Sequence, residues 1–357
     1  MTGRERIDAA LSGQPVDRLP TMPILHSGLP PIFDVPIGSF FTSAETMSDV
    51  IVRGFRTFGY DGVQLSLGVT GEAEALGATV EQPLDAAPIL RQYLLPDLTD
   101  VRALEALRNR AAHYPPAEGG RMPLYYESVA RTREATGDQA FVLAMLRGPL
   151  LAASQLCGVE SLLLAMITAP EAVAQVLEFT TDIALQLGKW LLGSGAHGLI
   201  LGEATCSPNF ISPKHYRRLV HSEHRALIQG LRGAGWQHVG LHVCGDVAPI
   251  MDAIISTGAT FMDVDHRVPA AKAVDLADNR IALRGNLDPS SIFRFGSPDD
   301  VRRQTTALIE DLVGSATGGP SSWILSSGCD IPPGTPATNI SAFVEAAMAP
   351  RVHRTLT

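Results

Sequence analysis

The stretch "HVGLHVCGD" at residues 238–246 joins an almost unbroken apolar run to a histidine and a cysteine near its end. Such a run is typical of a parallel β-strand that is buried on both faces. Residues two positions apart in a strand face the same side of the sheet, so His242 and Cys244 project together. The stretch therefore predicts a buried strand that carries two metal-capable side chains at its carboxyl end.

Further short apolar runs alternate with longer helical patterns along the chain. The runs lie at residues 18–25, 61–68, 141–148, 198–204, 260–266, 280–288 and 323–330, and the helical patterns include 171–194, 213–233 and 298–314. This alternation predicts right-handed crossovers and a parallel sheet. With the run at 238–245 there are eight strands, which fit a closed (β/α)8 TIM barrel better than an open sheet.

The remaining segments fit one domain over residues 1–357, because no Gly/Ser linker long enough to separate two domains interrupts the pattern. A helix at 3–13 precedes the first strand, and we expect the irregular segment 69–140 to place extra helices over the barrel mouth. The most apolar region, 141–170, is broken by charged residues and a Gly-Pro pair. It predicts a buried strand followed by a buried helix, not a membrane span.

The composition restricts the class of protein and its partners. The chain has 357 residues, 45% of them apolar, and a net charge of −9, which argues against nucleic acid or an anionic membrane as a partner. The start "MTGRERIDAALSG" lacks the apolar centre of a secretory signal, so we expect a cytoplasmic protein. The four cysteines are scattered, which does not indicate a disulfide framework in a reducing compartment.

Polar side chains gather at the predicted strand ends. In a (β/α)8 barrel the active site is built at the carboxyl ends of the strands. The side chains at or just past those ends are His26, Glu203, Cys206, His242, Cys244, Asp265, His266, Asn286, Asp288, Cys329 and Asp330. We therefore expect a functional site at this rim.

A zinc site is the most specific hypothesis for the rim. Cys329 stands in "SSGCDIPPGTP" (326–336), and in a closed barrel its strand end approaches those of His242 and Cys244. Two thiolates and one imidazole are a common zinc ligand set, and an open fourth position is the mark of a catalytic zinc. Each residue taken alone could equally be a core group, and Cys206 is a lesser alternative for a fourth ligand. The sulfur-rich set favours activation of a thiol over activation of water.

Several longer stretches resemble a known family. They are "RERIDAALSGQPVDRLP" (4–20), "VTGEAEALGATV" (69–80), "GEATCSPNFISPKHYRRLV" (202–220), "HVCGD" (242–246), "GNLDP" (285–289) and "SSGCDIPPGTPATNISAFVEAA" (326–347). Together they resemble the uroporphyrinogen decarboxylase superfamily, and more closely its methylcobamide:coenzyme M methyltransferase branch. The resemblance implies a (β/α)8 barrel in which zinc, held by His242, Cys244 and Cys329, activates a thiol that takes a methyl group from a methylated corrinoid protein.

Two departures from the family pattern bear on the chemistry. Decarboxylases of the family carry "RQAGRY" after the first strand, where this chain reads "LHSGLP" (25–30) without an arginine, which argues against porphyrinogen decarboxylation. Related methyltransferases carry an acidic residue on the sixth-strand rim that approaches the zinc. This chain offers Asp265 and His266 there. We assign Asp265 a catalytic role and take His266 as the candidate fourth metal ligand.

Three other rim residues have a functional and a structural interpretation. Glu203 either orients substrate as a catalytic carboxylate or serves the amino end of a helix. His26 and Asn286 are candidates for substrate contact, with a surface position and loop geometry as their alternatives.

The leading hypothesis is a zinc-dependent methyltransferase that uses methylcobalamin or another methylcorrinoid. The chain lacks the D-x-H-x-x-G pattern of a cobalamin-binding module, so the corrinoid is expected on a separate corrinoid protein, with a small thiol or a folate as acceptor. The alternatives are another zinc–thiolate alkyl transfer, such as epoxide opening or folate-linked methyl transfer, and a metal-free uroporphyrinogen decarboxylase-like enzyme. A non-catalytic barrel that only binds a corrinoid partner is the remaining alternative.

Overall fold

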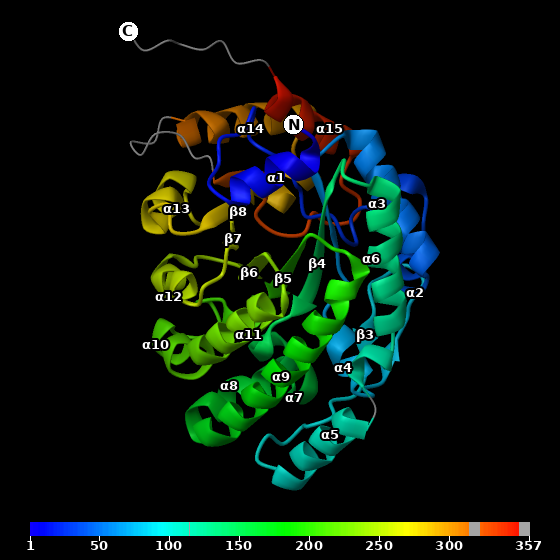
Figure 1. The fold of residues 1–357 in the computed structure, drawn as a ribbon, viewed down its shortest axis with the longest axis vertical. Coiled ribbons are helices and arrows are strands. Elements are labelled where there is room, and N and C mark those ends of the chain that lie inside the picture. Colours follow the sequence, from blue (N-terminus) through cyan, green and yellow to red (C-terminus); the bar gives the residue numbers. More distant parts are fainter. Residues whose placement is uncertain (114, 314–321, 350–357) are drawn as a thin grey trace.

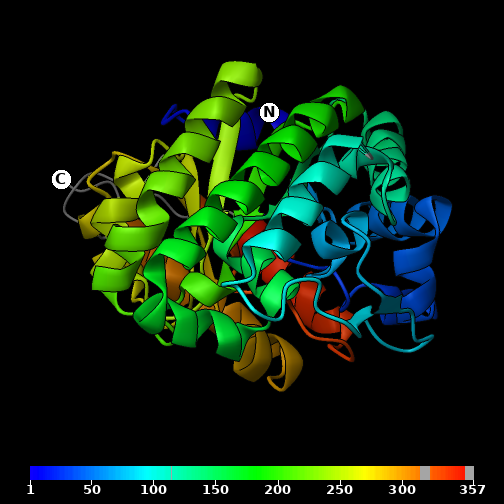
Figure 2. The same cartoon turned by 90° about the horizontal axis from the view of Figure 1, so that it is seen from below.

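Parallel strands form the centre of the molecule, and helices surround them (Figures 1 and 2). The computed structural model describes residues 1–113, 115–313 and 322–349. Seven strands pair in the order β1-β4-β5-β6-β7-β8-β9, and every pairing is parallel. These strands are β1 (Gly62–Leu65), β4 (Phe141–Arg147), β5 (Gly198–Gly202), β6 (His238–His242), β7 (Phe261–Val264), β8 (Ala282–Leu287) and β9 (Trp323–Ser327).

A short segment around Thr21 fills the eighth position of the barrel. Thr21 forms an isolated parallel bridge with Leu325 of β9, and its carbonyl oxygen accepts from the Asp61 amide at 2.8 Å on the β1 side. The sequence predicts a strand over 18–25 here, but the regular ladder does not form. Pro20 and Pro23 flank the bridge and have no N–H to donate. The segment nevertheless joins β9 to β1, so the (β/α)8 barrel predicted from the sequence is confirmed.

The helices follow the predicted alternation. The predicted helices at 3–13, 171–194 and 213–233 are present as α1, as α9 and as a run through α10, a π-helical stretch and α11. The helix predicted at 298–314 is α14, and residue 314 lies outside the described residues, as does 350–357 of the expected domain. The bounds are α1 (Gly3–Leu11), α2 (Ile37–Thr42), α3 (Ala44–Phe58), α4 (Gly71–Ala75), α5 (Val101–His113), α6 (Met122–Thr136), α7 (Pro149–Cys157), α8 (Val159–Thr168), α9 (Pro170–Leu191), α10 (Pro213–His215), α11 (His221–Ala234), α12 (Met251–Ser256), α13 (Ala270–Ala277), α14 (Pro298–Val313) and α15 (Ala337–Met348).

Segment 69–140 contains the elements that depart from the regular alternation. It holds α4, α5, α6 and a two-stranded antiparallel pair, β2 (Val80–Glu81) with β3 (Ile89–Leu90). In Figure 1, α5 lies at the end of the molecule near α7 and α9, while α6 runs beside α3. The loops of this segment, rather than α5 or α6, reach the mouth of the barrel, where Val69, Ala87 and Pro88 line a cavity.

Two apolar cores flank the sheet. Alternate strand residues face outward and pack against the helices, and the others face the barrel axis. The inward set is closed at the amino ends of the strands by Ile7, Ala10 and Leu11 of α1. The apolar residues above this plug are Met22, Phe141, Leu143, Met145, Ile200, Phe261, Ala282 and Ile324. The interior of the barrel is therefore packed with apolar side chains toward the amino ends of the strands. Polar side chains reach the axis only near the mouth.

The apolar region 141–170 forms β4 followed by two helices, α7 and α8, where the sequence predicts a strand and one buried helix; Leu164 and Ile167 of α8 are exposed. Within the described part of the chain, no single helix is both long and apolar enough to span a membrane. Only the pair α7 and α8, which meet at 108°, passes that test when the two are counted together. Both helices contact α9 and belong to the ring around the barrel.

A buried carboxylate holds the barrel seam together. The side chain of Asp61 is 3% exposed and accepts from the Thr21 amide at 2.8 Å. It also accepts two hydrogen bonds from Arg18, at 2.7 and 2.9 Å, and one from Arg6 of α1. One carboxylate thus joins α1, the Thr21 segment and the start of β1.

We expect Asp61→Ala to lower the free energy of unfolding by about 3–5 kcal/mol, because it leaves two partly buried guanidinium groups without their shared partner. The measurement is urea unfolding followed by circular dichroism. Asp138→Ala is the matched control, since Asp138 also pairs with two arginines but is 68% exposed. It should move the midpoint little. Equal shifts for the two variants would contradict the role of Asp61 in the seam.

Candidate functional site

A cavity of about 280 Å³ opens at the carboxyl ends of the strands. Its wall includes residues from the strand ends of β1, β4, β5, β6 and β9, from the Thr21 segment, and from the loops of segment 69–140. The predicted site residues that line it are His26, Glu203, His242, Cys244 and Cys329. Asp265, His266 and Asn286 are not among the lining residues.

The structure brings His242, Cys244 and Cys329 together. The Cys244 Sγ atom lies 3.3 Å from His242 Nε2, and the Cys329 Sγ atom lies 3.7 Å from the same nitrogen. The two sulfur atoms are 3.8 Å apart although the residues are separated by 85 positions in the chain. His242 and Cys244 come from the end of β6, and Cys329 follows β9.

These spacings suit a tetrahedral metal ion. A zinc ion at about 2.3 Å from sulfur and about 2.0–2.1 Å from nitrogen separates two sulfur ligands by about 3.8 Å, and a sulfur from a nitrogen ligand by about 3.6 Å. The three observed distances of 3.3, 3.7 and 3.8 Å lie close to these values. The three side chains could therefore hold a metal without rearrangement of the strands that carry them.

A buried relay fixes the orientation of the His242 ring. His242 Nδ1 lies 2.7 Å from the Asp263 carboxylate on the neighbouring strand β7, which leaves Nε2 directed at the two thiols. Asp263 in turn accepts two hydrogen bonds from Arg284 of β8, at 2.7 and 2.6 Å. A carboxylate behind the imidazole is the usual support of a metal-ligating histidine, because it sets the tautomer and raises the basicity of the ring.

The hydrogen bonds of the cluster shift the pKa values of its members. Burial alone would lower the pKa of His242, but its hydrogen bonds to Asp263 and Cys329 outweigh burial and raise the pKa to about 10. The hydrogen bond between the two thiols lowers the pKa of Cys244 and raises that of Cys329. The protonation of each of these three side chains is therefore linked to that of its neighbours in the cluster.

Asp265 and His266 lie on the β7 rim and hold loops. The Asp265 carboxylate accepts from the amide of Gly245 at 2.8 Å and from that of Arg267 at 3.0 Å, so it fixes the turn directly after Cys244. The ring of His266 lies between two carboxylates, with Nδ1 3.0 Å from Asp265 and Nε2 3.5 Å from Asp288. His266 is not part of the three-residue group that could hold a metal.

His26 stands in the cavity wall, and Asn286 does not. The His26 Nε2 atom accepts from the Gln64 amide at 3.1 Å, and its Nδ1 faces Asp330 at 3.6 Å. Burial, together with the nearby arginines, lowers the pKa of His26 to about 3, so the ring is neutral. The Asn286 amide instead donates to the Val268 carbonyl at 2.7 Å and holds the loop after β7.

Glu203 is fully buried in the wall of the cavity and caps the amino end of α7. Its carboxylate accepts from the amides of Leu150 at 3.1 Å and Leu151 at 2.8 Å. It also lies 2.7 Å from Nε2 of His224, whose Nδ1 meets the Tyr216 hydroxyl at 3.1 Å. The sequence left open whether Glu203 orients substrate or supports the amino end of a helix. The contacts favour the second role, because both carboxylate oxygens already accept hydrogen bonds.

Cys206 belongs to this second cluster and not to the first. Glu203, Cys206 and His224 place their possible ligand atoms within 4.8 Å of one another. Burial and the neighbouring Glu203 raise the pKa of the Cys206 thiol well above its usual range, and the group to which its sulfur belongs does not include His242, Cys244 or Cys329. The alternative of Cys206 as a fourth ligand of the His242 cluster is therefore not supported.

Comparisons with known proteins place this arrangement in a family. Residues 2–349 match the family described as uroporphyrinogen decarboxylase (URO-D). The chain belongs to the uroporphyrinogen decarboxylase family. Within the URO-D family it is 26% identical over 351 residues to a methylcobamide:CoM methyltransferase, MtbA, of Methanosarcina acetivorans, and 97% of each chain is covered. A uroporphyrinogen decarboxylase of Prochlorococcus marinus is 25% identical over 304 residues, which cover 84% of this chain and 81% of that protein.

The fold is also that of a solved structure. A methyltransferase from Methanosarcina mazei superposes with a TM-score of 0.86 at 24% identity, and the alignment covers 97% of this chain and 98% of the other. This match supports the barrel fold. It also shows that the extra elements of segment 69–140 belong to a fold shared along almost the whole chain.

Sequence reasoning missed four polar residues of this URO-D barrel. Asp263 and Arg284 form the relay behind His242, and Gln64 and Arg147 line the cavity. The sequence carries a signal for them: each is a charged or amide side chain inside an apolar strand, in the alternation that faces the barrel axis. A polar residue in such a position needs a partner, and that requirement marks it as a candidate from the amino-acid pattern alone.

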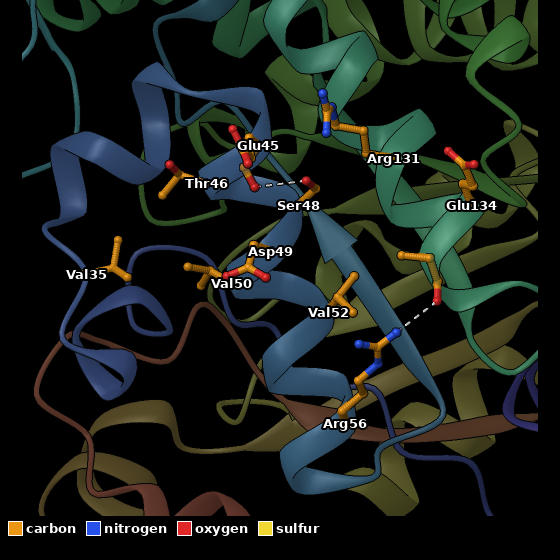
Figure 3. Close-up of a pocket in the computed structure, with 11 residues that line it drawn as sticks. Val35, Glu45, Thr46, Ser48, Asp49, Val50, Val52, Arg56, Arg131 and Glu134 are labelled. Carbon is orange, nitrogen blue, oxygen red and sulfur yellow. Dashed lines mark hydrogen bonds between the residues drawn. The ribbon is translucent and has the colours of Figure 1, made fainter.

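Figure 3 shows a larger hollow, of about 730 Å³, between α3 and α6. Its charged side chains are Glu45, Asp49, Arg56, Arg131 and Glu134. Arg131 is paired with Glu127, outside this set, at 2.7 Å. The hollow lacks a cluster of nucleophilic or metal-ligating groups among the residues that line it. We therefore place the functional site at the barrel mouth.

We expect Glu203→Gln to lower the free energy of unfolding by about 1–3 kcal/mol, because the new amide nitrogen would face backbone N–H groups that now have an acceptor. Thermal unfolding followed by circular dichroism measures this loss. Glu160→Gln, at an exposed position in the first turn of α8, is the control and should unfold like the wild type. A Glu203→Gln protein of unchanged stability would show that the carboxylate does not support α7.

Proposed function

We propose that the protein is a corrinoid-dependent methyltransferase that moves a methyl group from a methylated corrinoid, carried by a separate corrinoid protein, to a thiol activated by zinc. The observation that carries the proposal is the cluster of His242, Cys244 and Cys329 at the mouth of the barrel. The methylcobamide:CoM methyltransferases among its relatives match over 97% of their length, more than the decarboxylases do.

The donor set fits zinc better than the other common ions of proteins. Thiolates are soft ligands, which disfavours magnesium and calcium, and three protein ligands leave a fourth position for a reactant. A zinc ion in such a site supplies a non-redox Lewis acid that binds a thiol in its deprotonated form. Asp263 and Arg284 keep the His242 ring in place, and Asp265 fixes the turn that carries Cys244.

The surroundings of the mouth suit a large partner. Three apolar side chains stand exposed on loops that belong to this side of the barrel: Leu84 at 66%, Phe210 at 55% and Phe295 at 77%. Leu84 lies four residues from Pro88 of the cavity wall, and the other two follow β5 and β8. Exposed apolar side chains of this size can take part in a protein–protein contact. A corrinoid carried by another protein would approach from here.

We expect the purified protein to bind about one zinc per chain, and Cys244→Ser and Cys329→Ser to lose it, because each removes one of three protein ligands. Elemental analysis after dialysis gives the metal content. Cys157→Ser is the matched control: Cys157 is buried in α7, where its thiol donates to the Ala153 carbonyl. It should keep full zinc. Full zinc in both cluster variants would place the metal elsewhere.

We expect the zinc-loaded protein to demethylate free methylcobalamin in the presence of a small thiol, and Cys329→Ser to reduce the rate to the background reaction. Absorbance of the corrinoid and mass spectrometry of the methylated thiol follow the reaction. Transfer to tetrahydrofolate instead of a thiol, or opening of an epoxide, would favour the other zinc–thiolate reactions. Metal-independent release of carbon dioxide from a porphyrinogen would replace the proposal with decarboxylation.

A further inference from the structure

The two thiols at the mouth of the barrel are placed for a disulfide as well as for a metal. The sulfur atoms of Cys244 and Cys329 lie 3.8 Å apart, and both cysteines are free. A disulfide holds its sulfur atoms about 2.0 Å apart, so the two atoms must approach by about 1.8 Å for the bond to form. The question is whether the local backbone allows this approach.

Both cysteines lie in turns just beyond the strand ends. Cys244 is two residues past the end of β6 and precedes Gly245, whose φ of +87° is accessible mainly to glycine. Cys329 is two residues past the end of β9 and follows Gly328. Neither cysteine belongs to a helix or a strand. Rotation of the two side chains with a small shift of the turns therefore brings the sulfur atoms together without disturbing the sheet.

A small oxidant reaches this pair before it reaches the other cysteines. Cys244 and Cys329 are partly exposed and line the cavity of about 280 Å³ at the mouth. Cys157 is 2% exposed, and Cys206 is fully buried. The susceptibility of a thiol to oxidation follows its exposure and its thiolate character. Oxidation of the protein therefore begins at the mouth of the barrel.

We propose that Cys244 and Cys329 form a reversible disulfide when hydrogen peroxide enters the cavity, and that this bond releases the zinc. One thiolate sulfur attacks a peroxide oxygen, the O–O bond breaks, and hydroxide leaves a sulfenic acid behind. The second thiolate attacks this sulfur, the S–S bond forms, and the S–O bond breaks as a second hydroxide leaves. The two sulfur atoms together lose two electrons, which reduce one peroxide, and each hydroxide takes up a proton to become water.

The zinc half of this inference rests on the proposed function, and the disulfide half rests on the positions of the two thiols alone. The metal ligand is the thiolate, and a disulfide has none. After oxidation only His242 remains of the three ligands in the cluster. A reduced dithiol reverses the bond by thiol–disulfide exchange and restores all three. The mouth would thus carry a redox switch built from the same two cysteines that hold the metal.

The experiment counts thiols and zinc after exposure to hydrogen peroxide. The zinc-loaded protein is treated with peroxide and then with catalase, unfolded, alkylated and analysed by mass spectrometry. We expect free thiols to fall from four to two per chain, with a peptide pair that links Cys244 to Cys329. The mass before alkylation should fall by about 2 Da, the two hydrogens lost on disulfide formation. A chromogenic chelator should detect about one zinc released per chain, and dithiothreitol with added zinc should restore the starting state.

Three variants locate the bond. Cys244→Ser and Cys329→Ser should form no internal disulfide, and the cysteine that remains at the mouth should proceed to sulfinic acid, because no second thiol captures its sulfenic acid. Cys157→Ser is the matched control, since it removes a buried thiol away from the cavity. It should form the same link and release the same amount of zinc as the wild type. Circular dichroism confirms that each variant is folded.

A disulfide to Cys157 or Cys206 in the wild type overturns the proposal, as does sulfinic acid on one mouth cysteine while the other stays free. A link that forms while the zinc remains bound overturns the release of the metal. The metal-free protein, treated in parallel, separates this inference from the proposed function. Formation of the link in a protein that binds no zinc supports the disulfide and counts against the proposed function alone. Four free thiols after peroxide treatment of the metal-free protein overturn the disulfide, whatever the methyl-transfer activity of the zinc-loaded form.

Discussion

The carboxylate of Asp61 is the interaction on which the geometry of the mouth depends. It ties α1, the Thr21 segment and β1 together, where a regular eighth strand is prevented by Pro20 and Pro23. Because the sheet closes there, strand ends that are not neighbours face a common axis. That closure is what brings Cys329, after the last strand, to 3.8 Å from Cys244, after β6. In a flat open sheet about three strand spacings, roughly 14 Å, would separate these two ends.

The side chains inside the barrel change from apolar to polar toward the mouth. The charged residues there are either paired with an opposite charge or lack such a partner. Phe141, Phe261 and their neighbours fill the lower interior with apolar groups. Above them Asp263 and Arg284 form a buried ion pair that holds His242, although Nη1 of Arg284 has no hydrogen-bond partner. Among the described residues, Arg147 has no carboxylate partner of this kind, and its Nη2 donates to the Ser66 hydroxyl. The ion pair fixes the His242 ring from behind, whereas the charge of Arg147 is not compensated by a carboxylate.

Much of this arrangement could be predicted from the sequence, because it depends on patterns of short range. Apolar runs locate the strands, and alternation within a strand pairs His242 with Cys244. The barrel rule then brings Cys329 to them. The hydrogen-bond partner of each polar side chain comes from a distant segment of the chain, so these pairings could not be predicted from the sequence. The sequence places Glu203 at the rim but does not show that two backbone amides of α7 donate to its carboxylate. Asp265 and His266 likewise hold loops through contacts that no local sequence pattern encodes.

The plug formed by Ile7 and Leu11 of α1 gives the chamber a floor. A small molecule that lies against the thiols therefore leaves by the same passage through which it entered, past His26 and Pro88. Once a second and larger body rests on the rim, this passage is closed. With such a body in place, the shape of the barrel would require the small molecule to enter before it and to depart after it.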